Sequence, residues 1–198
     1  MKKDLLKRIA QKGYDVAYGA NLNFSTYDII KKYPGITAFL SICIGIVSFK
    51  WQFFATETVS IIMLIFGIAS VYVERFTSDI ESYGRLGKIH TDQLNSLKDL
   101  YYETKHKNED DDFSNIEARL NMIVSEYNKE SQPNQILFSS WYAHYKLFYE
   151  KDVSWMDEEL NFEVWKDKIP QSMKFILYVI LIHIIFYYSA DVLSDLLN

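Results

Sequence analysis

The chain has 198 residues, of which 49% are hydrophobic and 16% aromatic, and its formal net charge is −5. This length allows one domain or a membrane unit with a modest soluble part, and we expect no direct binding of nucleic acid. The single cysteine, Cys43, excludes an internal disulfide and gives no sign of an oxidising compartment. We expect Cys43 to pack as a small apolar residue.

Residues 3–30 have the pattern of an amphipathic helix, because apolar side chains such as Leu5 and Ile9 recur at helical spacing. This N-terminal segment has neither the continuous apolar region nor the small-residue cleavage site of a signal peptide, so we expect no cleavage. The step Tyr33-Pro34-Gly35 predicts a break in chain direction before the next segment.

Two apolar segments follow, at roughly 36–54 and 59–73. Each is near the lower limit of about 17 residues for a membrane-spanning helix. Charged and aromatic residues of the kind found at membrane interfaces flank both segments: Lys31, Lys32, Tyr33, Lys50, Trp51, Phe53, Phe54, Tyr72, Glu74 and Arg75. The pattern predicts a transmembrane helical hairpin in a lipid bilayer. The alternative is a hairpin buried inside a soluble helical bundle.

The distribution of basic residues predicts the orientation of this hairpin. Lysines and arginines lie before the first segment and after the second, whereas the loop between them has only Lys50. The positive-inside rule therefore places both ends of the hairpin, and the N-terminus, in the cytoplasm.

The region after the hairpin is expected to be helical and cytoplasmic. The second span should continue as one long helix from Phe76 to about His106. The acidic run 108–112 predicts a solvated loop, since it lacks the ligand spacing of a calcium site. Ser114 and Glu117 predict a capping box that opens a helix.

The step at residues 132–134 should end the helix that Ser114 begins. Two further helices are expected, over residues 136–151 and 155–165.

A third apolar block, roughly residues 173–188, predicts a third span, again near the lower length limit. The tail after it has no lysine or arginine, which suits a translocated end. The alternative is a helix buried against the cytoplasmic bundle or lying at the interface. His183 is the only clearly ionisable side chain deep in this block. It is either a functional group or a neutral imidazole that is hydrogen-bonded to another helix.

The predicted fold class is therefore all-α, in four parts. These are an N-terminal helix (1–35), a transmembrane hairpin (36–73), a cytoplasmic helical region (74–172), and a third span with a short tail (173–198).

Small and hydroxyl-bearing residues recur at helical spacing on one side of each span of the hairpin. They are Thr37, Ser41, Gly45 and Ser48 on the first, and Ser60, Gly67, Ser70 and Glu74 on the second. Such a face is typical of close helix packing. It could also line a narrow polar conduit once several copies assemble.

Residues that carry catalysis or hold cofactors form no recognisable pattern. His90, His106, His144 and His183 are scattered, without metal-ligand spacing. The glycines of the stretch 84–88 do not follow a strand, so this stretch is interpreted as structural and not as a phosphate-binding loop. We expect a non-enzymatic protein without a metal or cofactor.

Three features together resemble the SLATT family, the two-transmembrane effector domains associated with SMODS nucleotidyltransferases and SLOG ligand-binding proteins in bacterial conflict systems. They are the N-terminal segment Leu5–Tyr14, the tight hairpin with the long helix after it, and the segment Glu117–Tyr127. The resemblance covers roughly Leu5 to Phe148, and the block from Met173 lies beyond it.

The resemblance implies an effector in the bacterial inner membrane that responds to a nucleotide-derived signal, such as a cyclic nucleotide, during phage infection. It implies that the effector permeabilises the membrane, and a hairpin needs several copies of itself to do so. The alternative function is a non-enzymatic, membrane-anchored scaffold or sensor. Such a protein would recruit a cytoplasmic partner through the aromatic surface around Trp141, Tyr145 and Phe148.

Overall fold

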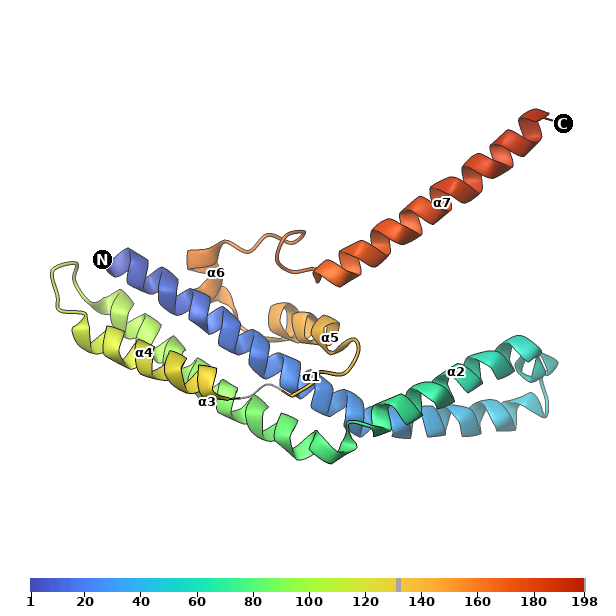
Figure 1. The fold of residues 1–198 in the computed structure, drawn as a ribbon, viewed down its shortest axis with the longest axis horizontal. Coiled ribbons are helices and arrows are strands. Elements are labelled where there is room, and N and C mark those ends of the chain that lie inside the picture. The colour runs from blue at the N-terminus through green and yellow to red at the C-terminus, as the bar shows by residue number, and fades with distance from the viewer. Residues whose placement is uncertain (131–132, 198) are drawn as a thin grey trace. The chain divides into compact units, whose positions relative to one another are not determined.

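The computed structural model describes residues 1–130 and 133–197, with side chains as far as Tyr187. Every regular element in this part of the chain is a helix, which confirms the predicted all-α class. The chain divides into two compact units, Met1–Asn161 and Phe162–Asn198. The first unit contains α1 to α6, and the second contains α7 (Figure 1).

Helix α1 runs without interruption from Lys2 to Ser48, with Pro34 inside it. The predicted break at residues 33–35 is therefore wrong. A proline removes one backbone hydrogen bond, and neighbouring elements can hold the helix together across that point. Here Ile30 and Tyr33 pack into an apolar cluster on one side of the proline. Figure 1 shows the ribbon of α1 continuing from the bundle into the hairpin.

Helix α2 spans Glu57–Glu74 and α3 spans Ile80–His106, so the prediction that the second span continues without a break is also wrong, whereas the predicted helix end near His106 is confirmed. A short 3₁₀ turn, Thr77–Asp79, separates the two helices. Threonine, serine and aspartate side chains compete for backbone hydrogen bonds and favour helix ends over helix interiors. The element that connects the bundle to the hairpin without a break is α1.

The first half of α1 packs along α3, and α4 (Ser114–Lys129) covers both. The interior between these helices is filled by large side chains that are fully buried: Leu5, Ile9, Tyr83, Leu86, Leu97, Leu100, Tyr101, Phe113, Ile116 and Leu120. Burial of apolar surface of this kind is the main favourable contribution to folding. Phe24 on α1 reaches close to Gly87 on α3, where no side chain obstructs it.

The predicted helix at Ser114 is confirmed, but the predicted capping box is wrong. Ser114 is the first residue of α4, and no side chain caps the helix from its N-cap residue, Phe113. The Ser114 amide and hydroxyl both donate to Oδ1 of Asp112, at 2.9 and 2.6 Å. These bonds lower the pKa of Asp112. Asp112 is thus the residue that orders this helix start.

Helix α5 (Ser139–Tyr145) continues into a π-helical turn, Lys146–Glu150, and α6 spans Ser154–Leu160. The first of these begins three residues after the expected start at 136, because Phe138 has a left-handed φ of 68°. Helix α6 ends earlier than the expected 165, at Leu160, because the next residue, Asn161, is also left-handed (φ 52°). The predicted step at 132–134 lies partly outside the described residues.

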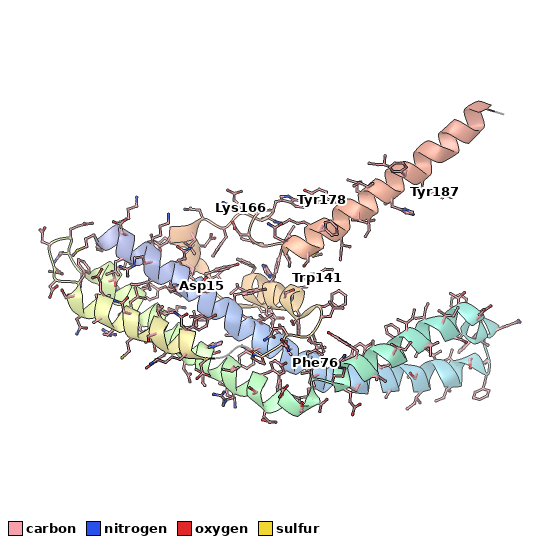
Figure 2. All side chains as sticks on the ribbon, viewed as in Figure 1. Asp15, Phe76, Trp141, Lys166, Tyr178 and Tyr187 are labelled. Atoms are coloured by element: carbon pink, nitrogen blue, oxygen red, sulfur yellow. The ribbon has the colours of Figure 1, made fainter. Side chains whose placement is uncertain are left out.

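The second unit contains α7, Gln171–Leu197. Lys174 Nζ donates to the carbonyl of Lys166 at 3.0 Å, and the Trp165 ring meets the Tyr178 ring edge-on at 6.3 Å. Figure 2 shows side chains, Tyr178 and Tyr187 among them, projecting on more than one side of this helix. As far as Tyr187, α7 is a shorter apolar helix than the two candidate spans. The side chains of the predicted tail, 189–198, lie outside the described residues.

Candidate functional site: the polar groove of the hairpin

The hairpin consists of the second half of α1 and all of α2, joined by a 3₁₀ turn at Gln52–Ala55. The two helices are long and apolar enough to cross a membrane, and only 11% and 6% of their apolar windows are buried. Large side chains such as Phe39 and Leu64 are 67% and 64% exposed. A soluble protein rarely exposes so continuous an apolar surface. The chain itself therefore does not bury the hairpin, contrary to the soluble-bundle alternative.

A groove lies between the two helices, toward the turn that joins them. Ser41, Gly45 and Ser48 line it from α1, and Ser60 lines it from α2. It has a volume of about 410 Å³, and its remaining walls are apolar. The structure thus brings together four of the small or hydroxyl residues that were predicted to share a face.

The hydroxyls of this face bond to carbonyls of their own helices. Ser41 Oγ donates to Thr37 O at 2.8 Å, Ser48 Oγ donates to Gly45 O at 2.7 Å, and Ser60 Oγ donates to Thr56 O at 3.2 Å. Each serine therefore satisfies its donor without a partner on the other helix. The oxygen lone pairs remain as acceptors in the groove.

The other predicted residues of the face are placed differently. Thr37 is buried, Ser70 is half-buried and donates to Phe66 O at 3.1 Å, and Gly67 lies on an exposed surface of α2. A Cβ atom built on Gly45 or on Gly67 would meet no atom within 4 Å. Neither glycine is needed for close helix packing within one chain.

His183 lies on α7, in the second unit, and is exposed. The structure gives no helix contact that would explain an imidazole at this position, among the residues it describes. The role of His183 therefore stays a prediction.

At the end of the hairpin next to the bundle, the π-helical turn is tied to α1 by an ion pair. Lys146 Nζ lies 2.6 Å from Asp28 Oδ2 and 4.4 Å from the centre of the Tyr142 ring, and Lys32 is 3.2 Å from the other oxygen of Asp28. Burial alone would raise the pKa of Asp28, but the bonds from Lys146 and Lys32 lower it. Asp28 is thus an anion that anchors this turn to α1. No spacing rule applied to the sequence could pair residues 118 positions apart.

The middle of the bundle contains a buried polar layer that sequence reasoning also missed. His90 is fully buried on α3, with its ring 4.9 Å from that of Tyr127 on α4. Within the described residues, neither ring nitrogen of His90 has a hydrogen-bond partner, nor has Ser25 Oγ or Gln93 Oε1. Unpaired buried polar atoms cost free energy, which leaves this layer less stable than an apolar one. Burial lowers the pKa of His90.

A second cavity, of about 210 Å³, lies in the bundle between α1, α3 and α6. Its lining combines the cationic Lys98 and Lys151 with the aromatic Phe24 and Trp155. Lys98 lies 3.1 Å from Asp152, whose pKa is lowered to about 2 by hydrogen bonds from Ser154 and then by Lys98. The described residues contain no group of three or more side chains that could hold a metal ion.

The aromatic residues singled out as a partner surface divide into two groups. Tyr145 is 53% exposed and stacks with Tyr149, which is 66% exposed. Trp141 and Phe148 are only half-buried, and the Phe148 ring packs 6.3 Å from Tyr14 on α1. The freely presented part of this surface is therefore the tyrosine pair.

One protein family matches most of the chain. The model of SLATT_6, the SMODS and SLOG-associating 2TM effector domain 6, matches residues 1–177. The chain belongs to the SLATT family. The match confirms the resemblance and extends it from Phe148 into the start of α7. No curated protein and no solved structure is significantly similar to the chain. This SLATT protein is a membrane protein with two candidate spans.

Proposed function

We propose that this SLATT protein permeabilises the bacterial inner membrane by assembling several copies around the polar groove of its hairpin. A nucleotide-derived signal triggers the assembly, and the N-terminus and the bundle lie in the cytoplasm. The orientation is supported by the basic residues that flank the hairpin and by their scarcity in its loop.

One observation carries the proposal. Ser41, Gly45, Ser48 and Ser60 share one open groove on a hairpin whose other surfaces are apolar and exposed. A single hairpin encloses no conduit, so water can cross only if grooves of neighbouring copies face one another. Serine oxygens that line such a conduit would replace part of the hydration of a passing ion.

The continuity of α1 supplies a route from the trigger to the groove. The same helix carries Asp28, which is paired with Lys146 in the bundle, and Ser41, which lines the groove. A movement of the bundle that turns or shifts α1 is transmitted directly to the groove. The buried atoms Ser25 Oγ and Gln93 Oε1, which have no hydrogen-bond partner among the described residues, favour such a movement, because repacking can give them partners.

The cavity at Lys98 and Lys151 is the proposed place of the trigger. Lysine ammonium groups bind phosphate, and Lys98 and Lys151 both line this cavity. The charge reversal Lys151→Glu should abolish the response to the signal while leaving insertion unchanged, as measured by membrane potential after induction with the partner synthase. An undiminished response would move the trigger elsewhere.

The test of the function itself is membrane potential in cells that express the protein with its activating partner. A potential-sensitive dye should report depolarisation within minutes of activation, and a variant lacking residues 36–73 should give none. An unchanged potential under confirmed activation contradicts the proposal.

A second candidate function is favoured by the exposed tyrosine pair. Tyr145 and Tyr149 present a flat stacked surface from the bundle, which suits a cytoplasmic partner of a membrane-anchored scaffold. Replacing residues 36–73 with an unrelated two-span anchor separates the two functions. Retained activity supports the scaffold, and lost activity with intact insertion supports the conduit.

We also propose that α7 forms a third span. Its 27 residues have a length of roughly 40 Å at the helical rise, and its apolar side chains are exposed as far as Tyr187. The end of the chain would then lie on the far side of the membrane.

A further inference from the structure

An exposed apolar pair stands at the turn that enters α5. Leu137 is 61% exposed and Phe138 is 53% exposed, whereas the preceding Ile136 is buried. The ring of Trp141 meets that of Phe138 edge-on at 5.0 Å and extends the apolar surface by one helical turn. Apolar side chains in this density are unusual on a surface that faces only water.

The backbone turns these two side chains outward. Phe138 has a φ of 68°, a region that bulky residues rarely adopt. The Ser139 amide and hydroxyl both donate to the carbonyl of Ile136, at 3.1 and 2.6 Å, and so close the turn. Ile136 faces the interior as a result, and the next two side chains face away from it.

The turn lies beside the cytoplasmic end of the hairpin. The Leu137 amide donates to the hydroxyl of Tyr72 at 3.3 Å, and Tyr72 is two residues from the end of α2. Ile136 packs in one apolar cluster with Val73 and Ile30. Figure 2 labels Trp141 on α5 and Phe76 just after α2, the aromatic residues that follow the turn and the span. Tyr72 therefore holds the turn next to the end of α2.

We infer that Leu137 and Phe138 insert into the lipid interface of the membrane that the hairpin spans. The occupant of this surface is lipid, because the surface is continuous with the interfacial end of α2, where Tyr72 and the exposed cationic Arg75 lie. Aromatic residues settle at this depth, and arginine suits the headgroups beside it. The inference rests on the membrane placement of the hairpin, but not on a conduit.

The consequence is that the bundle has a second attachment to the membrane besides the hairpin. Lys146, which holds Asp28 of α1, belongs to the π-helical turn that continues α5. Lipid contact at Phe138 would therefore act on α5 and its π-helical turn, which hold α1 through Lys146.

The test uses nitroxide labels on single cysteines, because Cys43 is the only native cysteine. In a Cys43→Ala background, Leu137→Cys is compared with Val71→Cys on the exposed side of α2 and with Met122→Cys on the exposed side of α4. The full chain is placed in vesicles of phosphatidylethanolamine and phosphatidylglycerol. Accessibility is measured to oxygen, which enters lipid, and to a water-soluble nickel chelate.

The ratio of oxygen to nickel accessibility at residue 137 should lie between that of residue 71 and that of residue 122. A ratio equal to that of residue 122, with residue 71 in lipid, overturns the inference and leaves the hairpin placement intact. A label at 137 shielded from both reagents means that a second copy covers the turn, which also overturns it. If residue 71 itself reads as aqueous, the inference and the membrane placement fall together.

A second variant separates insertion from folding. Phe138→Gly removes the ring and suits the left-handed backbone, so the fold should be retained. The label at 137 should then shift toward the aqueous ratio. The matched control Tyr149→Ala removes an exposed aromatic residue away from the turn and should leave the ratio unchanged. No shift with Phe138→Gly contradicts lipid insertion of the ring.

Discussion

Gly45 is the residue that distinguishes two roles of a small side chain in this hairpin, namely close helix packing within one chain and formation of a conduit between copies. No atom lies within 4 Å of a Cβ built on it, so Gly45→Leu should leave the single chain folded and inserted. The leucine would fill the groove and keep neighbouring copies apart. We therefore predict that Gly45→Leu abolishes depolarisation in activated cells, at unchanged membrane abundance.

Two neighbouring substitutions complete this experiment. Ser41→Leu should reduce depolarisation strongly if the serine hydrates a conduit and weakly if it only packs. Ile42 points about 100° away from Ser41 around the helix, and it is exposed outside the groove. Ile42→Leu should therefore leave depolarisation nearly unchanged. Full activity of both Gly45→Leu and Ser41→Leu would eliminate this face as conduit and as packing surface.

His90 predicts a pH dependence of bundle stability. Burial lowers its pKa below the ordinary value of 6.5, so its contribution to stability is fully present above pH 6.5 and is lost as the pH falls from 6.5 toward the lowered folded-state pKa, because the unfolded chain takes up the proton first. Between about pH 7.5 and about pH 5.5, the free energy of unfolding should fall by on the order of 1 kcal/mol. Asp28 stays ionised throughout, because its pKa is lowered from 3.8.

The comparison variant is His90→Phe, which keeps a ring in place without a titratable group. Thermal unfolding of the purified chain is followed by circular dichroism at both pH values. The loss of stability between the higher and the lower pH should be clearly smaller for His90→Phe than for the native chain. Equal losses would assign the acid sensitivity to other groups.

At the scale of elements, the contact of α1 with α3 depends on a glycine. A Cβ on Gly87 would lie 2.8 to 2.9 Å from ring atoms of Phe24, closer than such atoms approach. Gly87→Ala should therefore cost about 1–3 kcal/mol of stability despite the better helix propensity of alanine. Gly35→Ala, where nothing lies within 4 Å, should cost little. Denaturant unfolding of both variants measures these losses, and equal losses would contradict the role of Gly87.

The sequence predicts elements well where one periodic pattern decides them, as for the amphipathic N-terminal helix and the helix at Ser114. It fails where a local signal competes with tertiary packing. Pro34 predicts a break, yet α1 continues through it, with Ile30 and Tyr33 packed just before it. Conversely, the propensity of Thr77–Asp79 ends a helix that apolar periodicity alone would extend.

The candidate site likewise has a part that the sequence predicts and a part that it does not. The serines and Gly45 share a face because helical spacing dictates it, and spacing is visible in sequence. The pairing of Asp28 with Lys146 and the polar layer at His90 depend on contacts between distant segments, which one sequence does not reveal.

At the scale of the whole molecule, the number of spans decides on which side of the membrane the chain ends. With three spans, alkaline phosphatase fused after residue 198 should be active and a green fluorescent protein there should be dark. Fusions after residue 168, before α7, should show the opposite pattern, because this point remains cytoplasmic. Fluorescence at both positions would place α7 in the cytoplasm or on the membrane surface.

The length of α1 has a consequence for how the molecule could be engineered. Its 47 residues rise roughly 70 Å, more than twice the thickness of the apolar core of about 30 Å. The N-terminal half of α1 packs in the bundle, and its C-terminal half lines the groove. Because one continuous helix joins the two halves, the groove-lining residues have a fixed orientation around the helix axis relative to the bundle. Adding a single residue to α1 just after Pro34 would rotate the groove-lining residues by about 100° around the helix axis relative to the bundle, without changing the residues of either half. Ser41, Gly45 and Ser48 would then turn away from Ser60 on α2, and the chain would span the membrane without the groove.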